Sequence, residues 1–412
     1  MKTTRVLRAS VSAILLSLFL LPVTAHAQPC TAVVDGGTSY PSINVALAHF
    51  AATNAIGQTG PGTITVTGTC TENVSINDAR SVTIVAPSPG GASVTGGATI
   101  VGPLDNDAFD IFRSQHITLR NLEIKGTFSS TVASGGGGEG VFLTQASEVH
   151  IFGCDIHDNQ QAGVDAEIGS IVFLIGTTIQ NNTPNDGLDV IGNSSAIVRG
   201  TTIQNNGDPL VGGVGVFVGA NSVVRLGQQT ADLIQNNAKI GILARNLSNV
   251  NLGGGGGTTI QGHLTNGIVL QEGSHLQING PGGSVIQGNG SACPLDPTCG
   301  GVSASQDSTV DLTTGTISGN HGSGVSVQQG SNVQLTGATV SNNSGDGVHI
   351  QWISIGSFAS GNTITGNGGA SVFCSGRSLA LGDLSAFSNV RCEEIGQQTG
   401  HGHGEPDKDG HR

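Results

Sequence analysis

A glycine followed by an aliphatic residue recurs at intervals of 23 to 34 residues over the middle and C-terminal parts of the chain. A period of this length is typical of proteins built from stacked structural repeats, each of which packs only against its neighbours. The pairs are Gly140-Val141, Gly163-Val164, Gly187-Leu188, Gly215-Val216, Gly241-Ile242, Gly267-Ile268, Gly301-Val302, Gly324-Val325 and Gly347-Val348. The repeat constrains the fold more than any other feature of the sequence.

Each repeat contains three short segments in which apolar and polar residues alternate. The second segment follows a small polar turn such as Gly169-Ser170 or Gly330-Ser331, and the third ends in asparagine, as in Thr178–Asn182 and Thr202–Asn206. Alternation predicts strands with one apolar face, and the absence of helix-length segments between them excludes β-α-β crossovers. We therefore expect an all-β parallel β-helix with three strands per coil and about a dozen coils, in which the asparagines stack as a ladder.

The two ends of the chain differ from the repeats. Residues 1–27 combine Lys2, Arg5 and Arg8 with an apolar run and a small-residue site, Ala25-His26-Ala27, which predicts a secretory signal peptide. We expect a cap helix and the first coils over residues 28–100, with the helix at 42–54. Repeats should follow over 101–396, with a disulfide-closed C-terminal end, and a disordered His- and Gly-rich tail over 397–412. No later segment predicts a membrane span.

The composition limits the partners of the chain. Charged residues make up 10% of the sequence and the formal net charge is −13, which becomes −16 without the three basic residues of the signal peptide. A chain this acidic is not expected to bind nucleic acid or anionic lipid, and it should repel a polyanionic substrate unless a cation intervenes. We expect a secreted monomer.

Seven cysteines follow the signal peptide, and export permits disulfides. Connectivity cannot be derived from the sequence, so the pairing is a hypothesis based on position along the chain. The expected pairs are Cys30 with Cys70, Cys293 with Cys299, and Cys374 with Cys392, which leaves Cys154 as a buried thiol.

The repeats and the entry segment resemble the pectate-lyase-like β-helix superfamily, in the broad bacterial group of β-helix-repeat proteins. The entry segment includes Gly36-Gly37, Tyr40-Pro41-Ser42-Ile43 and Thr71-Glu72-Asn73-Val74. The resemblance implies a right-handed, single-stranded β-helix with an N-terminal cap helix. Members include lyases, hydrolases, esterases and epimerases of polysaccharides as well as non-catalytic surface proteins, so the fold does not assign an activity. The catalytic motifs of the hydrolases, methylesterases and lyases are absent from the coils, and no catalytic residue is carried over.

Stacking allows outward side chains to be predicted as columns. Two residues after the glycine, the column includes Phe142, Asp165, Asp189 and Phe217; four residues after it, the column includes Glu167, Arg245 and Gln271. Asp165 and Asp189 should be neighbours, so that they either share a proton or bind a cation such as Ca²⁺. The candidate catalytic residues are Asp165, Glu167, Asp189 and Arg245, with Asp165 and Asp189 as candidate metal ligands.

Candidate substrate-binding residues are Phe142, Phe217 and Gln271 near the acids, and Gln180 and Gln204 on the third strands. A row of amides can bind sugar hydroxyls, but the same row can simply pair along the stack. Two functions remain open at this point. One is a polysaccharide lyase or hydrolase that uses the acidic patch, and the other is a non-catalytic scaffold that binds polysaccharide or a cell-surface glycan.

Overall fold

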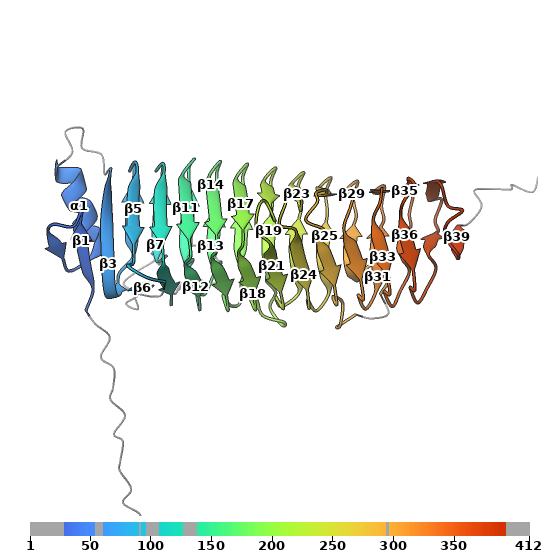
Figure 1. Cartoon of the computed structure of the whole chain (residues 1–412), viewed down its shortest axis with the longest axis horizontal. Coiled ribbons are helices and arrows are strands. Elements are labelled where there is room, and N and C mark those ends of the chain that lie inside the picture. Colours follow the sequence, from blue (N-terminus) through green and yellow to red (C-terminus); the bar gives the residue numbers. More distant parts are fainter. Residues whose placement is uncertain are drawn as a thin grey trace, which may run out of the picture.

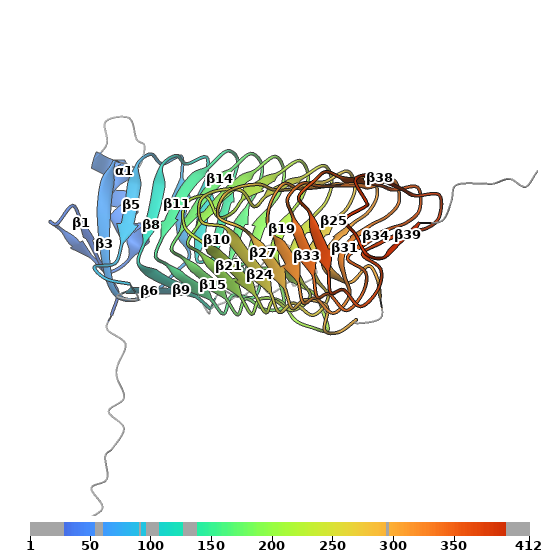
Figure 2. The ribbon, with the colours of Figure 1, turned by 45° about the vertical axis from the view of Figure 1, so that its right-hand side comes forward.

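The computed structural model describes residues 29–53, 61–89, 92–95, 107–126, 138–293 and 296–392, and it shows a rod of stacked coils (Figure 1). Most coils contribute one short strand to each of three sheets that run along the rod, here called sheets A, B and C. Figure 2 shows the coils from an oblique direction, with α1 at the N-terminal end. The expected signal peptide at 1–27 and the tail at 397–412 lie outside the described residues.

Sheet C contains the strands that open at the repeated glycine, together with the strands in register with them. It comprises β4 (Val74–Asn77), β7 (Phe109–Phe112), β10 (Val141–Thr144), β13 (Val164–Ala166), β16 (Leu188–Val190), β19 (Val214–Val218), β22 (Ile240–Ala244), β25 (Asn266–Leu270), β28 (Gly300–Ala304), β31 (Ser323–Val327), β34 (Val348–Ile350), β37 (Val372–Cys374) and β39 (Val390–Cys392).

Sheet B contains the second strand of each coil and the first strands of the chain. It comprises β1 (Thr31–Val34), β2 (Ser39–Tyr40), the first part of β3 (Gly62–Thr71), β5 (Val82–Val85), β8 (Ile117–Arg120), β11 (Glu148–Phe152), β14 (Ile171–Ile175), β17 (Ser195–Arg199), β20 (Val223–Arg225), β23 (Asn249–Asn251), β26 (His275–Ile278), β29 (Thr309–Leu312), β32 (Asn332–Leu335), β35 (Ile355–Phe358) and β38 (Leu379–Gly382).

Sheet A contains the third strands. It comprises the end of β3, β6 (Ala92–Thr95), β9 (Leu122–Lys125), β12 (Asp155–His157), β15 (Thr178–Gln180), β18 (Thr202–Gln204), β21 (Asp232–Gln235), β24 (Thr258–Gln261), β27 (Val285–Gln287), β30 (Thr316–Ser318), β33 (Thr339–Ser341) and β36 (Thr363–Thr365). The expected all-β parallel β-helix with three strands per coil is therefore confirmed.

The register follows the sequence repeat. Val141 pairs with Val164, and Val164 pairs with Leu188, so one repeat step is one coil of the rod. The pairing along the rod is parallel, except that β1 pairs antiparallel with β2 and β3 at the N-terminal end. Inward aliphatic side chains of all three sheets, such as Ile179 and Leu188, are fully buried and form one continuous core. The hydrophobic effect acting on this core holds the coils together.

Two buried polar ladders satisfy the turns between the strands. Asn182, Asn206, Asn320, Asn343 and Asn367 belong to the expected asparagine ladder, in which a side-chain amide donates to the next asparagine at 2.8 to 3.0 Å. A second ladder, which the sequence analysis did not identify, consists of serines before the sheet B strands. Each backbone N–H of this ladder donates to the hydroxyl of the serine one coil along at 3.1 to 3.3 Å. Both ladders compensate the burial of turn backbone.

The repeated glycine is required by close approach between coils. A β-carbon at Gly163 would lie 2.9 Å from the carbonyl oxygen of Gly187, 2.7 Å from Nδ2 of Asn182 and 2.5 Å from a methyl group of Ile179. The same three kinds of neighbour surround Gly140 and Gly187. The glycine of the sequence repeat is therefore a packing requirement of the stack.

Helix α1 (Ile43–Thr53) covers the N-terminal end of the rod, within the expected range of 42–54. Ile43, Leu47 and Phe50 are buried against the first coil, as the helical spacing predicts. The hydroxyl of Ser42 accepts the N–H of Val45, and the carboxylate of Glu72 accepts the N–H groups of Ile43 and Asn44 at 2.7 and 3.0 Å. These contacts fix the helix over the otherwise open core. Among the described residues, no helix is long and apolar enough to cross a membrane.

Three disulfides join the expected pairs Cys30–Cys70, Cys293–Cys299 and Cys374–Cys392, and Cys154 is a free buried thiol. Cys374 and Cys392 are register partners on β37 and β39, so their disulfide closes the last two strands of sheet C. Three disulfides indicate that the chain matures in an oxidising environment.

Candidate acidic site on sheet C

The outward column predicted from the repeat is present on sheet C. Phe142 is the register partner of Asp165, Asp165 of Asp189, and Asp189 of Phe217. These side chains lie opposite the inward residues of the same strands, yet Asp165 is only 7% exposed. Asp189 is half-buried, with its Oδ1 atom fully buried. The two aspartates therefore form adjacent steps of one column, bounded by an aromatic ring at each end.

Three further acids lie beside this pair, in turns that precede the sheet C strands. They are Asp107, Glu139 and Asp186, of which Asp107 is 2% and Glu139 7% exposed. Asp107 Oδ1 accepts the N–H groups of Gly138 and Glu139 at 2.8 and 3.0 Å, and Asp186 Oδ1 accepts the N–H of Val214. The structure thus extends the predicted pair into the acidic cluster, defined here as Asp107, Glu139, Asp165, Glu167, Asp186 and Asp189.

The carboxyl groups of the cluster form pairs. Glu139 lies close enough to Asp107, and Asp189 close enough to Asp186, for the second carboxyl group of each pair to raise the pKa of the first. Two neighbouring carboxyl groups can form a hydrogen bond when one of them carries a proton. The arrangement therefore favours shared protons over full ionisation.

Burial and mutual repulsion both raise the pKa values of these acids. Burial, assisted by the Asp107 carboxyl, raises the pKa of Glu139 to about 10. Burial also raises the pKa of Asp165 well above its ordinary range, with a further contribution from the charge of Glu167, and does the same for Asp189, with a contribution from Asp186. At neutral pH the cluster consequently retains protons that exposed carboxyl groups would have lost.

Several buried polar atoms in and beside the cluster lack a hydrogen-bond partner in the described part of the chain. They are Oε2 of Glu139, Oδ1 of Asp165, Oδ1 of Asp189 and Nε2 of Gln161. Buried polar atoms are normally paired, so orphaned carboxyl oxygens on neighbouring strands indicate that a proton, a cation or a ligand group completes the site.

The geometry of the cluster bears on the expectation that Asp165 and Asp189 bind Ca²⁺. Calcium in proteins takes six to eight oxygen ligands. Among the described residues, the acids of the cluster do not place three carboxylate oxygens within 4.8 Å of one another. Asp165 and Asp189 can supply two carboxylates to a cation, but the cluster is closer to a proton-sharing site than to a calcium cage.

Arg245 lies beside the acidic cluster, where it contacts Phe217 and interacts with the charge of Asp186. Its guanidinium lies 4.7 Å from the centre of the Phe217 ring, and its charge acts against the burial that raises the pKa of Asp186. Glu167 is half-buried, and burial raises its pKa. Gln271 follows Arg245 one coil along, since its N–H donates to the carbonyl of Ala244. Arg245, Glu167 and Gln271 therefore lie along the second predicted column.

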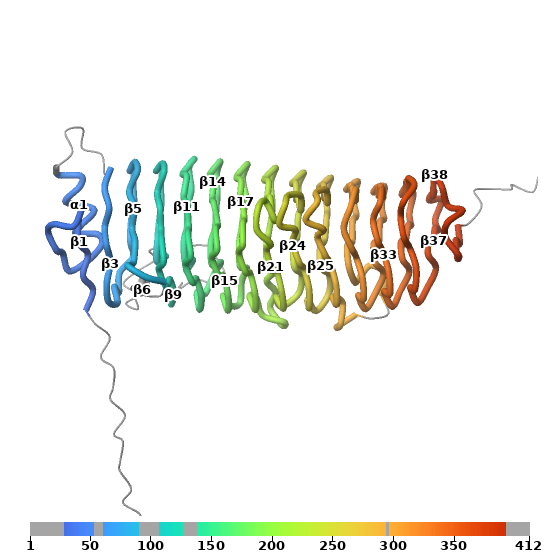
Figure 3. Tube along the Cα trace, in the orientation of Figure 1, coloured from blue at the N-terminus to red at the C-terminus, as the bar shows by residue number. Residues whose placement is uncertain are grey.

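Two longer turns border sheet C, and Figure 3 shows them extending beyond the neighbouring coils. The 208–213 turn is closed by paired hydrogen bonds between Asp208 and Gly212 and carries Leu210, which is 92% exposed. It packs against the turn that contains Asp186, because a β-carbon on Gly213 would lie 2.8 Å from the carbonyl oxygen of Asn185. This turn therefore stands beside the acidic cluster.

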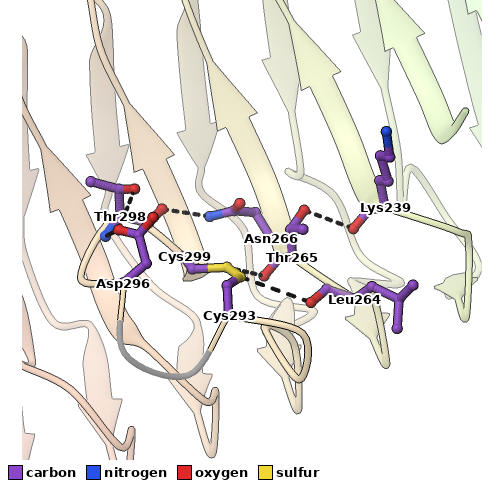
Figure 4. The surroundings of a disulfide bond; sticks show 8 residues. All are labelled: Lys239, Leu264, Thr265, Asn266, Cys293, Asp296, Thr298 and Cys299. Atoms are coloured by element: carbon purple, nitrogen blue, oxygen red, sulfur yellow. Dashed lines mark hydrogen bonds between the residues drawn. A yellow bond between two sulfur atoms is a disulfide. The ribbon is translucent and has the colours of Figure 1, made fainter. Parts of the chain in front are cut away.

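The second turn contains the Cys293–Cys299 disulfide and lies farther along the rod (Figure 4). The amide of Asn266 donates to the carbonyl of Thr298 at 2.8 Å, and the carboxylate of Asp296 accepts the N–H and hydroxyl of Thr298. These bonds hold the turn against the edge of β25. It is separated from the acids by several coils.

Gln180 and Gln204, predicted to bind substrate, lie on β15 and β18 of sheet A and not beside the acids. Each glutamine of this row donates to the previous one, so that Gln204 bonds to Gln180 at 2.9 Å and Gln180 to Asp155 at 3.0 Å. The row continues through Gln235, Gln261 and Gln287, which line a shallow depression of about 460 Å³. The amides are largely engaged with one another.

Sequence reasoning did not place Asp107, Glu139 and Asp186 beside the Asp165–Asp189 pair. For two of them a signal was present, because Glu139 and Asp186 each stand immediately before a strand-opening glycine. Their turns therefore occupy equivalent places in the stack. Asp107 precedes a strand without this glycine signal, and no repeat step connected it to Glu139.

The comparison with family models agrees with the fold. The family model described as a right-handed β-helix region matches residues 63–255. No curated protein matches this chain in sequence. The A-module of the Azotobacter vinelandii mannuronan C-5 epimerase AlgE6 is 14% identical, with a TM-score of 0.39, over 83% of this chain and 96% of that one.

Two other solved structures show a distant similarity. The Agl-KA catalytic domain is 14% identical, with a TM-score of 0.42, over 85% of this chain and 66% of that one. The Streptococcus pneumoniae surface protein and adhesin PfbA is 9% identical, with a TM-score of 0.28, over 82% and 94%. The family match and the three-sheet coil define the chain as a right-handed parallel β-helix protein.

Proposed function

We propose that this chain is a secreted enzyme that binds a polysaccharide along sheet C and hydrolyses it by acid catalysis at the Asp165–Asp189 pair. The observation that carries the proposal is the adjacency of two desolvated carboxyl groups whose Oδ1 atoms lack a partner among the described residues. A carboxyl group that remains protonated at neutral pH can protonate a glycosidic oxygen. Its partner can then act as base or nucleophile.

The separation of the two strands supports this chemistry. Neighbouring parallel strands lie about 4.8 Å apart, and retaining glycosidases place their two carboxyl groups about 5 Å apart. Asp165 and Asp189 occupy the same position on β13 and β16. Phe142 and Phe217, next to them in the column, offer aromatic surface on which a sugar ring can pack.

Charge supports a neutral glycan as the substrate. The acidic cluster contains six acids, whereas the charge of Arg245 acts to lower the pKa of one of them, Asp186. With a net charge of −13, the chain would repel a polyuronate. A neutral glucan, mannan or xylan carries no such penalty.

The proposal is tested by incubating the purified protein with neutral and acidic polysaccharides and measuring reducing ends. We expect product from a neutral glycan, at least about 100-fold less product with Asp189→Asn, and no loss with Asp311→Asn, an outward aspartate on sheet B. The proposal would be refuted if reducing ends were released from polygalacturonate alone, or if Asp165→Asn and Asp189→Asn left the activity unchanged. If chelation abolished the activity and Ca²⁺ restored it, the mechanism at the Asp165–Asp189 pair would depend on a bound cation and not on acid catalysis.

A non-catalytic glycan-binding scaffold is the second candidate. The deep burial of Asp165 favours it, because a catalytic carboxyl group must reach its substrate. This function predicts retention on a neutral glycan column without release of reducing ends, together with binding that Asp189→Asn leaves unchanged.

A further inference from the structure

Two histidines and a glutamate converge on the outer surface of sheet B, near the N-terminal end of the rod. His116 immediately precedes β8, and Glu148 and His150 lie on β11. Because Val149 pairs with Ile117, Glu148 stands opposite His116 on the neighbouring coil. His150 is two residues beyond Glu148 and so points to the same face of the strand.

The three side chains present their ligand atoms to one another. Glu148 Oε1 lies 3.0 Å from Nδ1 of His116 and 2.9 Å from Nε2 of His150, and all three atoms fall within 4.8 Å of one another. Two ligands about 2.1 Å from a tetrahedral Zn²⁺ are separated by about 3.4 Å. The three ligand atoms are therefore close enough to share one ion after small side-chain rotations.

We propose that His116, Glu148 and His150 bind a divalent transition metal, for which Zn²⁺ is the most suitable probe. Two imidazole nitrogens and one carboxylate are the donor set of Zn²⁺ and of divalent iron, copper and nickel, whereas Ca²⁺ and Mg²⁺ prefer oxygen ligands. The triad lies on sheet B, whereas the acidic pair lies on sheet C, so the triad is not part of the acidic site.

The surroundings hold one histidine in place and leave the other accessible. The ring of His150 stacks on Phe173 of the next coil, with centroids 4.3 Å apart and planes 9° apart. His116 has a side-chain exposure of 66%, against 28% for His150. Stacking therefore fixes His150, which supplies two preplaced ligands together with Glu148. The exposed His116 side chain can rotate to complete the protein ligands, and water supplies the remaining positions.

The triad can be reached from solvent. His116 lines a depression of about 620 Å³ with Arg80, Arg113 and Gln145, through which an ion can reach the triad.

The experiment is a calorimetric titration of the full chain with Zn²⁺. His401, His403 and His411 are replaced by alanine in every sample, so that the C-terminal histidines do not compete. We expect one site per chain, weakened at least about 100-fold by His150→Ala and by Glu148→Gln, and also weakened by His116→Ala. His275→Ala removes a histidine in the same register as Glu148 on β26 and should have no effect.

Circular dichroism and thermal denaturation without metal establish that each variant is folded. Glu148→Gln keeps the shape of the side chain and is the second test if an alanine variant does not fold. Absence of Zn²⁺ binding in the tail-substituted chain would overturn the proposal. So would binding that His116→Ala and His150→Ala leave unchanged.

Discussion

Asp165 on β13 and Asp189 on β16 are register partners, and the Oδ1 atom of each is buried without a hydrogen-bond donor in the described part of the chain. Two carboxyl groups in this relationship cannot both ionise without a large electrostatic cost. The pair therefore defines the chemistry of the acidic cluster. It also links the function proposed for sheet C to measurable properties of the folded protein.

The acidic cluster should make the fold sensitive to alkaline pH. The folded-state pKa values of Asp165, Asp189 and Glu139 are raised, to about 10 for Glu139, so the folded state keeps protons that the unfolded chain releases. The stability contributed by these protons is complete below the ordinary carboxyl pKa of about 4 and is lost as pH rises through the raised values.

Denaturation by urea at several pH values measures this loss. Glu139→Gln should flatten the decline in unfolding free energy by up to about 1.4 kcal/mol for each pH unit above 5. Asp311→Asn, on a different sheet, should show the same decline of unfolding free energy with pH as the parent protein. Equal slopes for the parent and Glu139→Gln would show that the cluster is ionised at neutral pH.

His263 should make the fold sensitive to acid. It occupies an asparagine position in the buried ladder, where its Nδ1 accepts the N–H of Asn237 at 3.2 Å and its Nε2 lies 3.3 Å from the carbonyl of Ile234. Burial lowers its pKa from 6.5 to about 4. The neutral ring thus contributes stability that is complete above about pH 6.5 and is lost as pH falls toward 4, by roughly 3 kcal/mol in total.

The variant His263→Asn restores the residue type of the rest of the ladder. It should keep the fold and reduce the slope of unfolding free energy between pH 6.5 and 4, as measured by chemical denaturation at each pH. His321→Asn, which changes a histidine outside the ladder, is the control. An unchanged acid slope in His263→Asn would contradict the assignment of a neutral, buried imidazole.

Gly241 tests the packing requirement of the repeat. A β-carbon there would lie 2.5 Å from the carbonyl oxygen of Gly267 and 2.7 Å from both Nε2 of His263 and a methyl group of Ile260. We expect Gly241→Ala to reduce the unfolding free energy by about 1–3 kcal/mol, because overpacking forces the coils apart. Gly255→Ala is the matched control, since no atom lies within 4 Å of its added methyl group. Equal stability of the two variants would refute the requirement.

The sequence was sufficient to predict the coil, since every strand has the same short alternating pattern and the glycine sets the step. The 24-residue step from Gly163 to Gly187 correctly placed Asp165 beside Asp189. Burial was not predictable in the same way. An outward position in a single strand indicates a solvated side chain, but Asp165 and Ser326 in this column are only 7% and 1% exposed.

The remaining members of the acidic cluster depend on contacts between turns, where the repeat is least regular. Glu139 and Asp107 are brought together by turns whose lengths follow no period. The pairing of His116 with Glu148 depends likewise on where a turn ends and a strand begins. Such contacts cannot be predicted from local sequence, because they form only when the coils stack.

The central claim is that the Asp165–Asp189 pair holds a proton at neutral pH. Infrared difference spectroscopy of the carboxylic acid C=O stretch measures this directly, with each variant compared with the parent protein. We predict a protonated-carboxyl band at neutral pH that is diminished by Asp165→Asn and by Asp189→Asn, and that Asp311→Asn leaves unchanged. A spectrum without such a band, or a band that both substitutions at the pair leave intact, would contradict the claim.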